Sequence, residues 1–381
     1  MKDPRTSRLF EERVDSESGV KYYVLKEKVA TYQQGFYFCN DSMTKDGRYL
    51  WFYACFPPVY SEAARHLGYV DFETDEIVLC HDTLFTSASP YIDTETGEAY
   101  FTWENGIYRR APGKDERSEK IVTLKFDGAT HRLATHMTRS SDKKYFYLDC
   151  QVGTKRCYIG KVNIENGDFD KWLSTDYHIN HAQINPKDDN LLLCARDYFT
   201  NTDTGEFYTI PFDENGNYLR LWTVTPDGKM VNYPARNDFA THEFWGSDGR
   251  KIYYVNFNGI QCIELDTDKH YCVHECDVWH AFATKDERYF AYDEALVAPG
   301  EDHWRGCPTA VHFYDRTTGK DIKIVSYQPS NGFSPQKPNI YHIDPHPRFV
   351  ANDKYVVFTT TVLGSVDVAL AFTEDLKELT K

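Results

Sequence analysis

Short runs of apolar and aromatic residues recur along this chain, and each run is bounded by a cluster of Asp, Asn, Ser or Gly. The clearest example is the run Thr241–Trp245, which a Ser-Asp-Gly turn separates from the run Lys251–Val255. An Asp-Gly pair between two runs rich in β-branched and aromatic residues predicts a β-hairpin. The pattern therefore predicts strands joined by tight turns.

This frame of strand, turn and strand occurs seven times, which predicts a repeat architecture. A period of about 40 to 50 residues with several strands per unit is typical of a β-propeller. Second hairpins between the copies would supply the outer strands. We therefore expect an all-β fold of seven four-stranded antiparallel blades, in one domain over residues 1–381, with a β-sandwich as the alternative. The turns of the seven copies are Asp46-Gly47, Thr96-Gly97, Asp142-Lys143, Asp188-Asp189, Asp248-Gly249, Asp286-Glu287 and Asp353-Lys354.

The two ends of the chain each carry a strand pattern that could close the ring. Residues 1–20 are charged and turn-rich, and Lys21–Lys26 then reads as a strand that precedes the first repeat. The C-terminal run Asp367–Phe372 would be its partner in the last blade, so that no sheet edge is left exposed. A frayed terminal strand is the alternative.

Histidines occupy the same frame position in five of the seven copies, six or seven residues before the turn. The first strand of each propeller blade lines the central channel, so equivalent positions converge on one mouth of it. A ring of imidazoles there is a candidate metal and acid–base site. The alternative is that each histidine only caps its own strand. The five residues are His136, His181, His242, His280 and His346.

The segment Tyr341–Phe349 carries a candidate metal site. If it is a strand, His342, Asp344 and His346 alternate onto one face. Two imidazoles and a carboxylate suit a divalent transition metal such as Mn, Fe or Zn, and His280 could add a ligand from the neighbouring blade. A hydrogen-bonded strand end is the alternative.

Three further residues are candidates for the chemistry of such a site. His242 is a natural proton acceptor near neutral pH. Arg220 and Arg196 each stand where a guanidinium could bind a substrate carboxylate. The alternatives are a hydrogen-bonded channel histidine and two surface arginines.

Composition and charge narrow the classes of partner. The net charge is −15 and no Lys- or Arg-rich block occurs, which argues against nucleic acid, whose binding rests on a basic surface. No apolar stretch is long enough for a signal peptide or a membrane span. The ten cysteines contain no CxxC pair and are expected to be reduced, so we expect a cytoplasmic protein without a membrane partner.

Several of these residues together resemble a known family. The most specific segment is Thr241–Trp245, with the sequence THEFW, followed by Asp248-Gly249. With the supporting segments it is similar to the oligogalacturonate lyases, which are cytoplasmic polysaccharide lyases of pectin degradation built as seven-bladed β-propellers. The supporting segments are His181–Cys194, Arg220–Trp222, His280 and His346–Phe349.

This resemblance implies roles for individual residues. His242 would be the base, Arg220 would assist it, and a manganese ion would be held by His280 and by a Gln-x-x-His-x-His segment. In that segment Asp344 replaces a histidine and Tyr341 replaces the glutamine, with His342 able to compensate. Arg196 stands where the family has a histidine. We therefore expect His280, His342, Asp344 and His346 as metal ligands, and Arg196, His181 and His136 as substrate contacts.

The resulting expectation is a carbon–oxygen lyase that acts on short anionic oligosaccharides of uronic acids. It would proceed by metal-assisted β-elimination and leave an unsaturated uronide. The changed metal and arginine positions keep open a different uronide, such as one that contains glucuronate. A non-catalytic propeller that binds a peptide or protein is the second alternative.

Overall fold

A computed structural model describes most of the chain, and the blades can be followed through it. Strands of the first three blades each form a four-stranded antiparallel sheet. The described residues are 1–56, 65–85, 90–126, 130–153, 156–197, 199–200, 207–208, 210–235, 239–297, 307–330 and 343–381. Blade 1 holds β3 (Tyr32–Gln34), β4 (Tyr49–Cys55), β5 (Arg65–Asp71) and β6 (Glu76–Phe85); blade 2 holds β7 (Tyr91–Ile92), β8 (Ala99–Trp103), β9 (Gly106–Arg110) and β10 (Glu119–Thr123); blade 3 holds β11 (Thr130–Arg139), β12 (Tyr145–Val152), β13 (Arg156–Asn163) and β14 (Phe169–Thr175).

The remaining four blades complete the ring, and an insertion in blade 4 adds a two-stranded hairpin. Blade 4 holds β15 (Ile179–Asn185), β16 (Asp188–Arg196), β19 (Tyr218–Val224) and β20 (Met230–Ala235), with the hairpin of β17 (Phe199–Thr200) and β18 (Phe207–Tyr208); blade 5 holds β21 (Thr241–Trp245), β22 (Lys251–Val255), β23 (Gly259–Glu264) and β24 (Lys269–Glu275); blade 6 holds β25 (Ala281–Ala283), β26 (Tyr289–Ala295), β27 (Thr309–Asp315) and β28 (Lys320–Gln328); blade 7 holds β29 (Arg348–Val350), β30 (Tyr355–Thr360), β31 (Asp367–Phe372), β2 (Lys21–Leu25) and β1 (Phe10–Val14).

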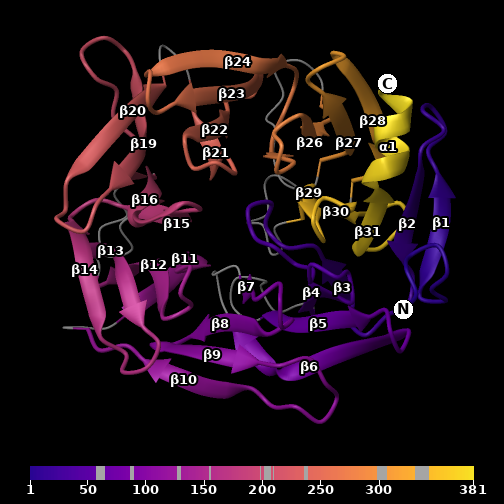
Figure 1. Ribbon diagram of the computed structural model, residues 1–381, viewed down its shortest axis with the longest axis horizontal. Helices are drawn as coiled ribbons and strands as arrows, with labels where there is room; N and C mark the ends of the chain where they lie inside the picture. The colour runs from indigo at the N-terminus through magenta and orange to yellow at the C-terminus, as the bar shows by residue number, and fades with distance from the viewer. Residues whose placement is uncertain are drawn as a thin grey trace.

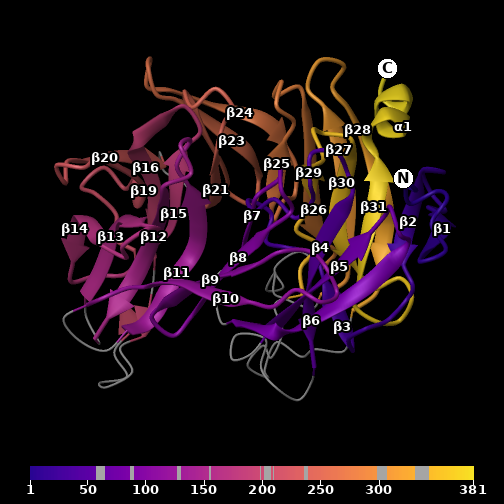
Figure 2. The same ribbon diagram turned by 60° about the horizontal axis from the view of Figure 1, so that its bottom comes forward.

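The seven-bladed propeller predicted from the repeat is confirmed, and the β-sandwich alternative is wrong. Figure 1 shows the seven sheets arranged around one central axis, with the first strand of each blade nearest to it. Figure 2 shows the same ring tilted, with the inner strands running along the channel. Equivalent positions of the inner strands therefore lie at the same height around the channel.

The ring closes in blade 7, where the two ends of the chain meet (Figure 1). β2 pairs with β31 through Tyr23 opposite Leu370 and Val24 opposite Ala369, as predicted. The sequence reading missed β1, which pairs with β2 and makes this blade five-stranded. It also gave no sign of the short helix α1 (Thr373–Leu379), whose Leu376 is buried against the same blade. No helix in the described part of the chain has the length and apolar character to cross a membrane.

The hydrophobic core lies between neighbouring blades, because each inner sheet face packs on the next blade. Phe244 and Tyr253 of blade 5 stack at 5.2 Å between ring centres, and Tyr253 meets Phe290 of blade 6 at 5.5 Å. The turns lock onto one another as well. Gly249 has φ +70°, and an added Cβ would lie 2.2 Å from Oδ1 of Asn185, whose amide donates to the Gly249 carbonyl at 2.7 Å. Only glycine fits this turn, so the turn of blade 5 is fixed to blade 4.

Candidate active site

The structure brings the five in-register histidines together around one aromatic side chain, Tyr37. Tyr37 lies between β3 and β4 and reaches the mouth of the channel where the inner strands begin. The centres of its ring and of the histidine rings are 5.0 Å apart for His136, 6.0 Å for His181, 6.5 Å for His242, 6.0 Å for His280 and 4.8 Å for His346. The imidazoles therefore face one common space.

Irregular backbone turns three of these side chains toward the channel. His181, His242 and His346 have φ of +57°, +52° and +47°, a left-handed conformation that is uncommon for a residue with a Cβ. At His181 and His242 the pairing register of the inner strand also shifts, between Asn180 and Gln183 and between Thr241 and Phe244. Such β-bulges re-aim a side chain and cluster at functional sites, where the backbone strain is retained.

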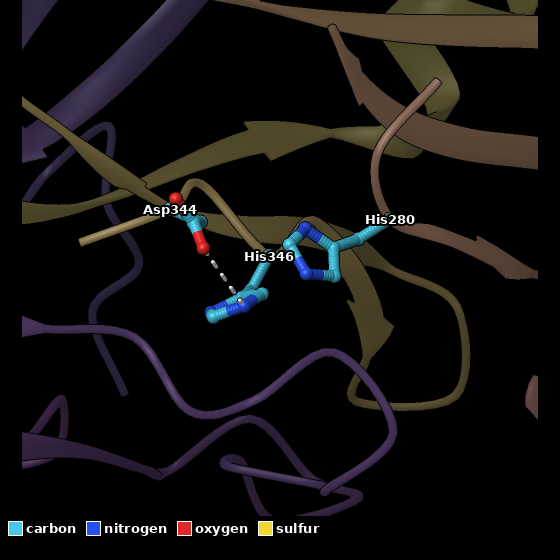
Figure 3. A group of neighbouring side chains, drawn as sticks. All are labelled: His280, Asp344 and His346. Atoms are coloured by element: carbon cyan, nitrogen blue, oxygen red, sulfur yellow. Dashed lines mark ion pairs between the residues drawn. The ribbon is translucent and has the colours of Figure 1, made fainter. Parts of the chain in front are cut away.

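Three of the four predicted metal ligands form one buried group. The ligand atoms of His280, Asp344 and His346 all lie within 4.8 Å of one another, and Nε2 of His346 is 3.9 Å from Oδ2 of Asp344. Figure 3 shows the Asp344 carboxylate directed toward the His346 ring, with the His280 ring beside it. Two imidazoles and one carboxylate match the ligands that divalent transition metals take in proteins, so the donor set fits such an ion. His342, the fourth predicted ligand, lies outside the described residues.

Asp293 orients this group from behind. One carboxylate oxygen accepts the backbone N–H of His280 at 2.6 Å, and the other lies 3.0 Å from Nδ1 of His280 and accepts the backbone N–H of His346 at 3.1 Å. A carboxylate on Nδ1 fixes the ring orientation and directs Nε2 toward a metal. Asp293 was not predicted from the sequence.

The local backbone at this group differs from the prediction. The predicted alternation assumed a strand over Tyr341–Phe349, but residues 343–347 are irregular and β29 begins at Arg348. Pro345 and Pro347 explain the change, because proline has no N–H for the strand ladder. Asp344 and His346 therefore meet through the positive φ of His346 and not through strand alternation.

A second buried group connects Arg220 to the histidines. Arg220 donates from Nε to Glu243 at 3.2 Å and from Nη1 to Asp197 at 3.1 Å, and Nδ1 of His181 lies 2.8 Å from the other oxygen of Glu243. The Glu243 side chain is fully buried. Burial alone would raise the pKa of Glu243, but the charges of Arg220 and His181 outweigh it and hold that pKa well below its usual range. Arg220 is thus a fixed cation, braced by two carboxylates.

His242 lies between these two groups. Its ring centre is 4.1 Å from that of His280, and its Nδ1 is 3.1 Å from the Tyr37 hydroxyl. Burial, followed by the nearby charges of His280 and Arg220, lowers the pKa of His242 well below its ordinary value. Burial also raises the pKa of Tyr37. At neutral pH His242 is therefore an unprotonated imidazole beside a protonated phenol.

With this geometry established, known proteins supply a comparison. No protein-family model matches the chain. It is 23% identical to the oligogalacturonide lyase of Pectobacterium atrosepticum over 239 residues, which are 58% of this chain and 56% of that protein. The chain thus spans about half the length of the curated relative it matches. The resemblance to the oligogalacturonate lyases is confirmed.

Solved structures of the same family share the fold over nearly the whole chain. An oligogalacturonate lyase in complex with manganese superposes with a TM-score of 0.71 at 16% identity, and the oligogalacturonate lyase of Vibrio parahaemolyticus with 0.72 at 18% identity. Each alignment covers 95% of this chain and 96% of the other. The propeller is therefore the fold of oligogalacturonate lyases.

The two remaining predicted substrate contacts, His136 and Arg196, lie in different surroundings. His136 is buried beside His181, with 4.7 Å between ring centres, and its Nδ1 lies 3.0 Å from the amide oxygen of Asn40. Arg196 stacks on Tyr177, with its guanidinium carbon 4.1 Å from the ring centre. The next residue, Asp197, is the one that joins the Arg220 group.

Sequence reasoning assigned no role to Tyr37, Asp197, Asp293 or Glu243. Glu243 had a signal, because it belongs to the THEFW segment on which the resemblance rests. Tyr37 and Asp293 had none, because neither occupies the repeated histidine position of the inner strands.

Proposed function

We propose that this protein is a carbon–oxygen lyase that cleaves short oligosaccharides of uronic acids by β-elimination. The observation that carries the proposal is the unprotonated imidazole of His242 between a cation-binding group and the braced Arg220. β-Elimination needs a base for the weakly acidic proton beside the uronate carboxylate, and positive charge for the anion that forms.

His242 would remove that proton. Its lowered pKa keeps the imidazole neutral at neutral pH, although a lowered pKa also makes it a weaker base. Tyr37, which contacts Nδ1 of His242, would hold the ring so that the opposite nitrogen faces the substrate. Positioned general bases typically contribute a factor of about 10² to 10⁴ in rate.

Arg220 would stabilise the negative charge that develops on the carboxylate. Glu243 and Asp197 hold the guanidinium in place before substrate arrives, so little reorganisation is needed during the reaction. The same two carboxylates offset its charge, which leaves the channel mouth poorer in positive charge than the sequence suggested.

A divalent metal would be held by His280, Asp344 and His346, with Asp293 orienting His280. When bound, such an ion supplies positive charge against a carboxylate oxygen. Manganese is our proposal for its identity, because a solved oligogalacturonate lyase with this fold is in complex with manganese. The substrate is then a small anionic oligosaccharide, either an oligogalacturonate or, given Asp344 and Arg196, a different uronide.

The test is to incubate the protein with digalacturonate and with a glucuronate-containing disaccharide, each with and without Mn²⁺. Cleavage produces an unsaturated uronide, which ultraviolet absorbance detects. The proposal predicts a metal-dependent increase with at least one of the two disaccharides. No unsaturated product from either, with a folded protein and metal present, would reject the lyase function and favour a binding propeller.

A further inference from the structure

Five aromatic rings form a continuous series that ends on His242. Consecutive ring centres are 5.1 Å apart from Phe212 to Tyr218, 5.1 Å from Tyr218 to Phe239, 5.1 Å from Phe239 to Phe257 and 5.0 Å from Phe257 to Trp279. Trp279 is then 6.1 Å from the His242 ring. The three ring pairs from Tyr218 to Trp279 are stacked, with interplanar angles of 28°, 25° and 21°. We name these five residues the aromatic strip.

The strip lies on the face of the propeller that carries the histidines. Phe239 and Trp279 directly precede the inner strands of blades 5 and 6, which begin at that mouth. Phe257 lies in the loop between β22 and β23, and Tyr218 begins β19, both at the same end of their blades. Phe212 lies in the insertion that precedes β19. Rings from three neighbouring blades thus lead outward from His242.

Packing of the blades does not account for the strip. Phe212 is 60% exposed and Phe239 is 39% exposed, and the buried Tyr218 lies between them and supports both rings. Exposed large apolar residues that gather on one surface often mark a binding site. Among the described residues, the core clusters between blades include Tyr218 but not Phe239, Phe257 or Trp279.

The backbone at Phe257 is the second, independent observation. Its φ is +68°, a left-handed conformation that is a genuine outlier for a bulky side chain. Such a conformation is destabilising and is retained where the surrounding structure and the site require it. The strained loop places the Phe257 ring between Phe239 and Trp279 and so makes the strip continuous.

We propose that the aromatic strip binds the sugar rings of the substrate that lie beyond the one whose proton His242 removes. The apolar C–H faces of pyranose rings suit flat aromatic surfaces, while their hydroxyl groups remain available to solvent and to exposed polar neighbours such as Asn258. Because the strip is continuous with His242, we assign it to the further sugar units of the same substrate. None of the five strip residues carries a charge, so the strip accepts a neutral sugar as well as a uronate.

This inference rests on the proposed lyase function and extends it to substrate length. Binding energy from remote sugar units can be used to position the reacting unit, so longer oligosaccharides should react with higher kcat/KM than a disaccharide. A disaccharide reaches little beyond His242 and Trp279, whereas a tetrasaccharide extends over Phe257 and Phe239.

The experiment measures kcat/KM on di-, tri- and tetrasaccharides of the uronide that the wild-type protein cleaves. Phe239→Ala and Phe257→Gly each remove one ring, and Phe257→Gly also relieves the positive φ, so that its fold should be retained or stabilised. We expect each variant to lose about 3- to 10-fold on the tetrasaccharide and less than twofold on the disaccharide. Phe257→Tyr, which keeps a ring, should recover most of the loss.

Tyr327→Ala is the matched control, because Tyr327 is 57% exposed on β28 and lies outside the strip. It should leave activity on all three lengths unchanged. Equal losses on all lengths in the strip variants, or no loss on the tetrasaccharide, would overturn the strip while the lyase function stands. A wild-type protein that neither cleaves uronides nor binds them by calorimetry would overturn the proposed function and the strip together. Retained cleavage with strip variants that lose only a protein partner would reject the sugar as occupant.

Discussion

Two groups of histidines in this propeller have opposite electrostatic environments. The first is the ring at the channel mouth, where His242 faces other imidazoles and Arg220. The second, which we call the outer clasp, joins blades 5 and 6 away from the channel and consists of His274, Tyr292, Glu294, His312 and Asp321.

Carboxylates make the difference between His312 of the outer clasp and His242 of the ring. In the outer clasp, His312 lies 3.1 Å from Asp321 through Nδ1 and 3.0 Å from Glu294 through Nε2. Burial alone would lower the pKa of His312, but its hydrogen bonds to Asp321 and Glu294 outweigh that and raise it. At His242 burial acts in the same direction as the neighbouring cations, and the pKa falls. His312 therefore keeps its proton more readily than a free histidine does, and His242 loses its proton more readily.

The comparison teaches that position within a blade decides what a histidine can do. The clasp histidines lie on the outer strands β24 and β27, where His274 reaches Asp321 of the neighbouring blade at 2.7 Å and His312 meets Asp321 and Glu294 of its own blade. The ring histidines lie where the inner strands converge, and there the neighbours His280 and Arg220 lower the pKa of His242. The contacts of the outer clasp join blades 5 and 6, whereas the surroundings of His242 suit it to act as a base.

The largest expected effect is on kcat, and it distinguishes the histidines of the channel mouth from those of the outer clasp. His242→Ala should lower kcat by about 10² to 10⁴ on a uronide that the wild-type protein cleaves, because it removes the base. Circular dichroism and the melting temperature should stay near wild type, since His242 lies at the channel mouth and is only partly buried.

The matched control is His312→Ala in the outer clasp. It should lower the melting temperature and leave kcat within about twofold, because the clasp is outside the channel. Near wild-type turnover in His242→Ala would transfer the role of base to His181 or His136.

The second prediction concerns Asp293, the carboxylate that orients His280 in the channel-mouth group. Asp293→Asn should weaken binding of Mn²⁺ by about 10- to 100-fold, because His280 loses the partner that orients it. Calorimetric titration of the metal-free protein measures this without reference to activity.

Asp315→Asn is the control for this prediction. Asp315 is also buried in blade 6 and ion-paired, in its case to Arg288 at 2.7 Å. Its replacement should leave metal affinity unchanged. Equal weakening in both variants would mean that Asp293 acts through the stability of the blade alone.

The fold was predictable because the same pattern of strand, turn and strand recurs along the whole sequence. Every copy carries a turn signal such as Asp248-Gly249 between apolar runs, and the number of copies gives the number of blades. β1 was missed because Glu11, Glu12 and Arg13 are exposed on the outer edge and show no apolar alternation.

The site was only partly predictable, for a different physical reason. The repeated frame located His242 and His280, but backbone irregularity and not strand alternation brings Asp344 to His346. Tyr37 reaches His242 across 205 residues of sequence, and Asp293 joins His280 of its own blade to His346, which lies 53 residues further along. Contacts between residues so far apart in the chain leave no local pattern in the sequence.

The third prediction tests the clasp as a fastener. Asp321→Asn should lower the free energy of unfolding by about 1–3 kcal/mol, because Asp321 accepts from Tyr292 and pairs with both His274 and His312. Chemical denaturation measures it. Asp268→Asn is the control, since Asp268 also pairs with a histidine, His270 at 3.2 Å, but is itself 70% exposed. Activity of Asp321→Asn should match wild type under native conditions, and a large loss of kcat would contradict the separation of clasp from ring.

The smallest expected effect is the pH dependence that the clasp gives to stability. The folded-state pKa of His312 lies above its unfolded value of about 6.5, so the folded protein binds this proton more tightly. The stabilisation is complete below about pH 6.5 and is lost as pH rises through the raised pKa. Because Asp321 and Glu294 are 25% and 22% exposed, solvent screening should keep the effect under about 1 kcal/mol. Melting temperatures of wild type and His312→Gln between pH 6 and 9 should therefore converge as pH rises, and parallel curves would show that His312 binds its proton no more tightly in the fold.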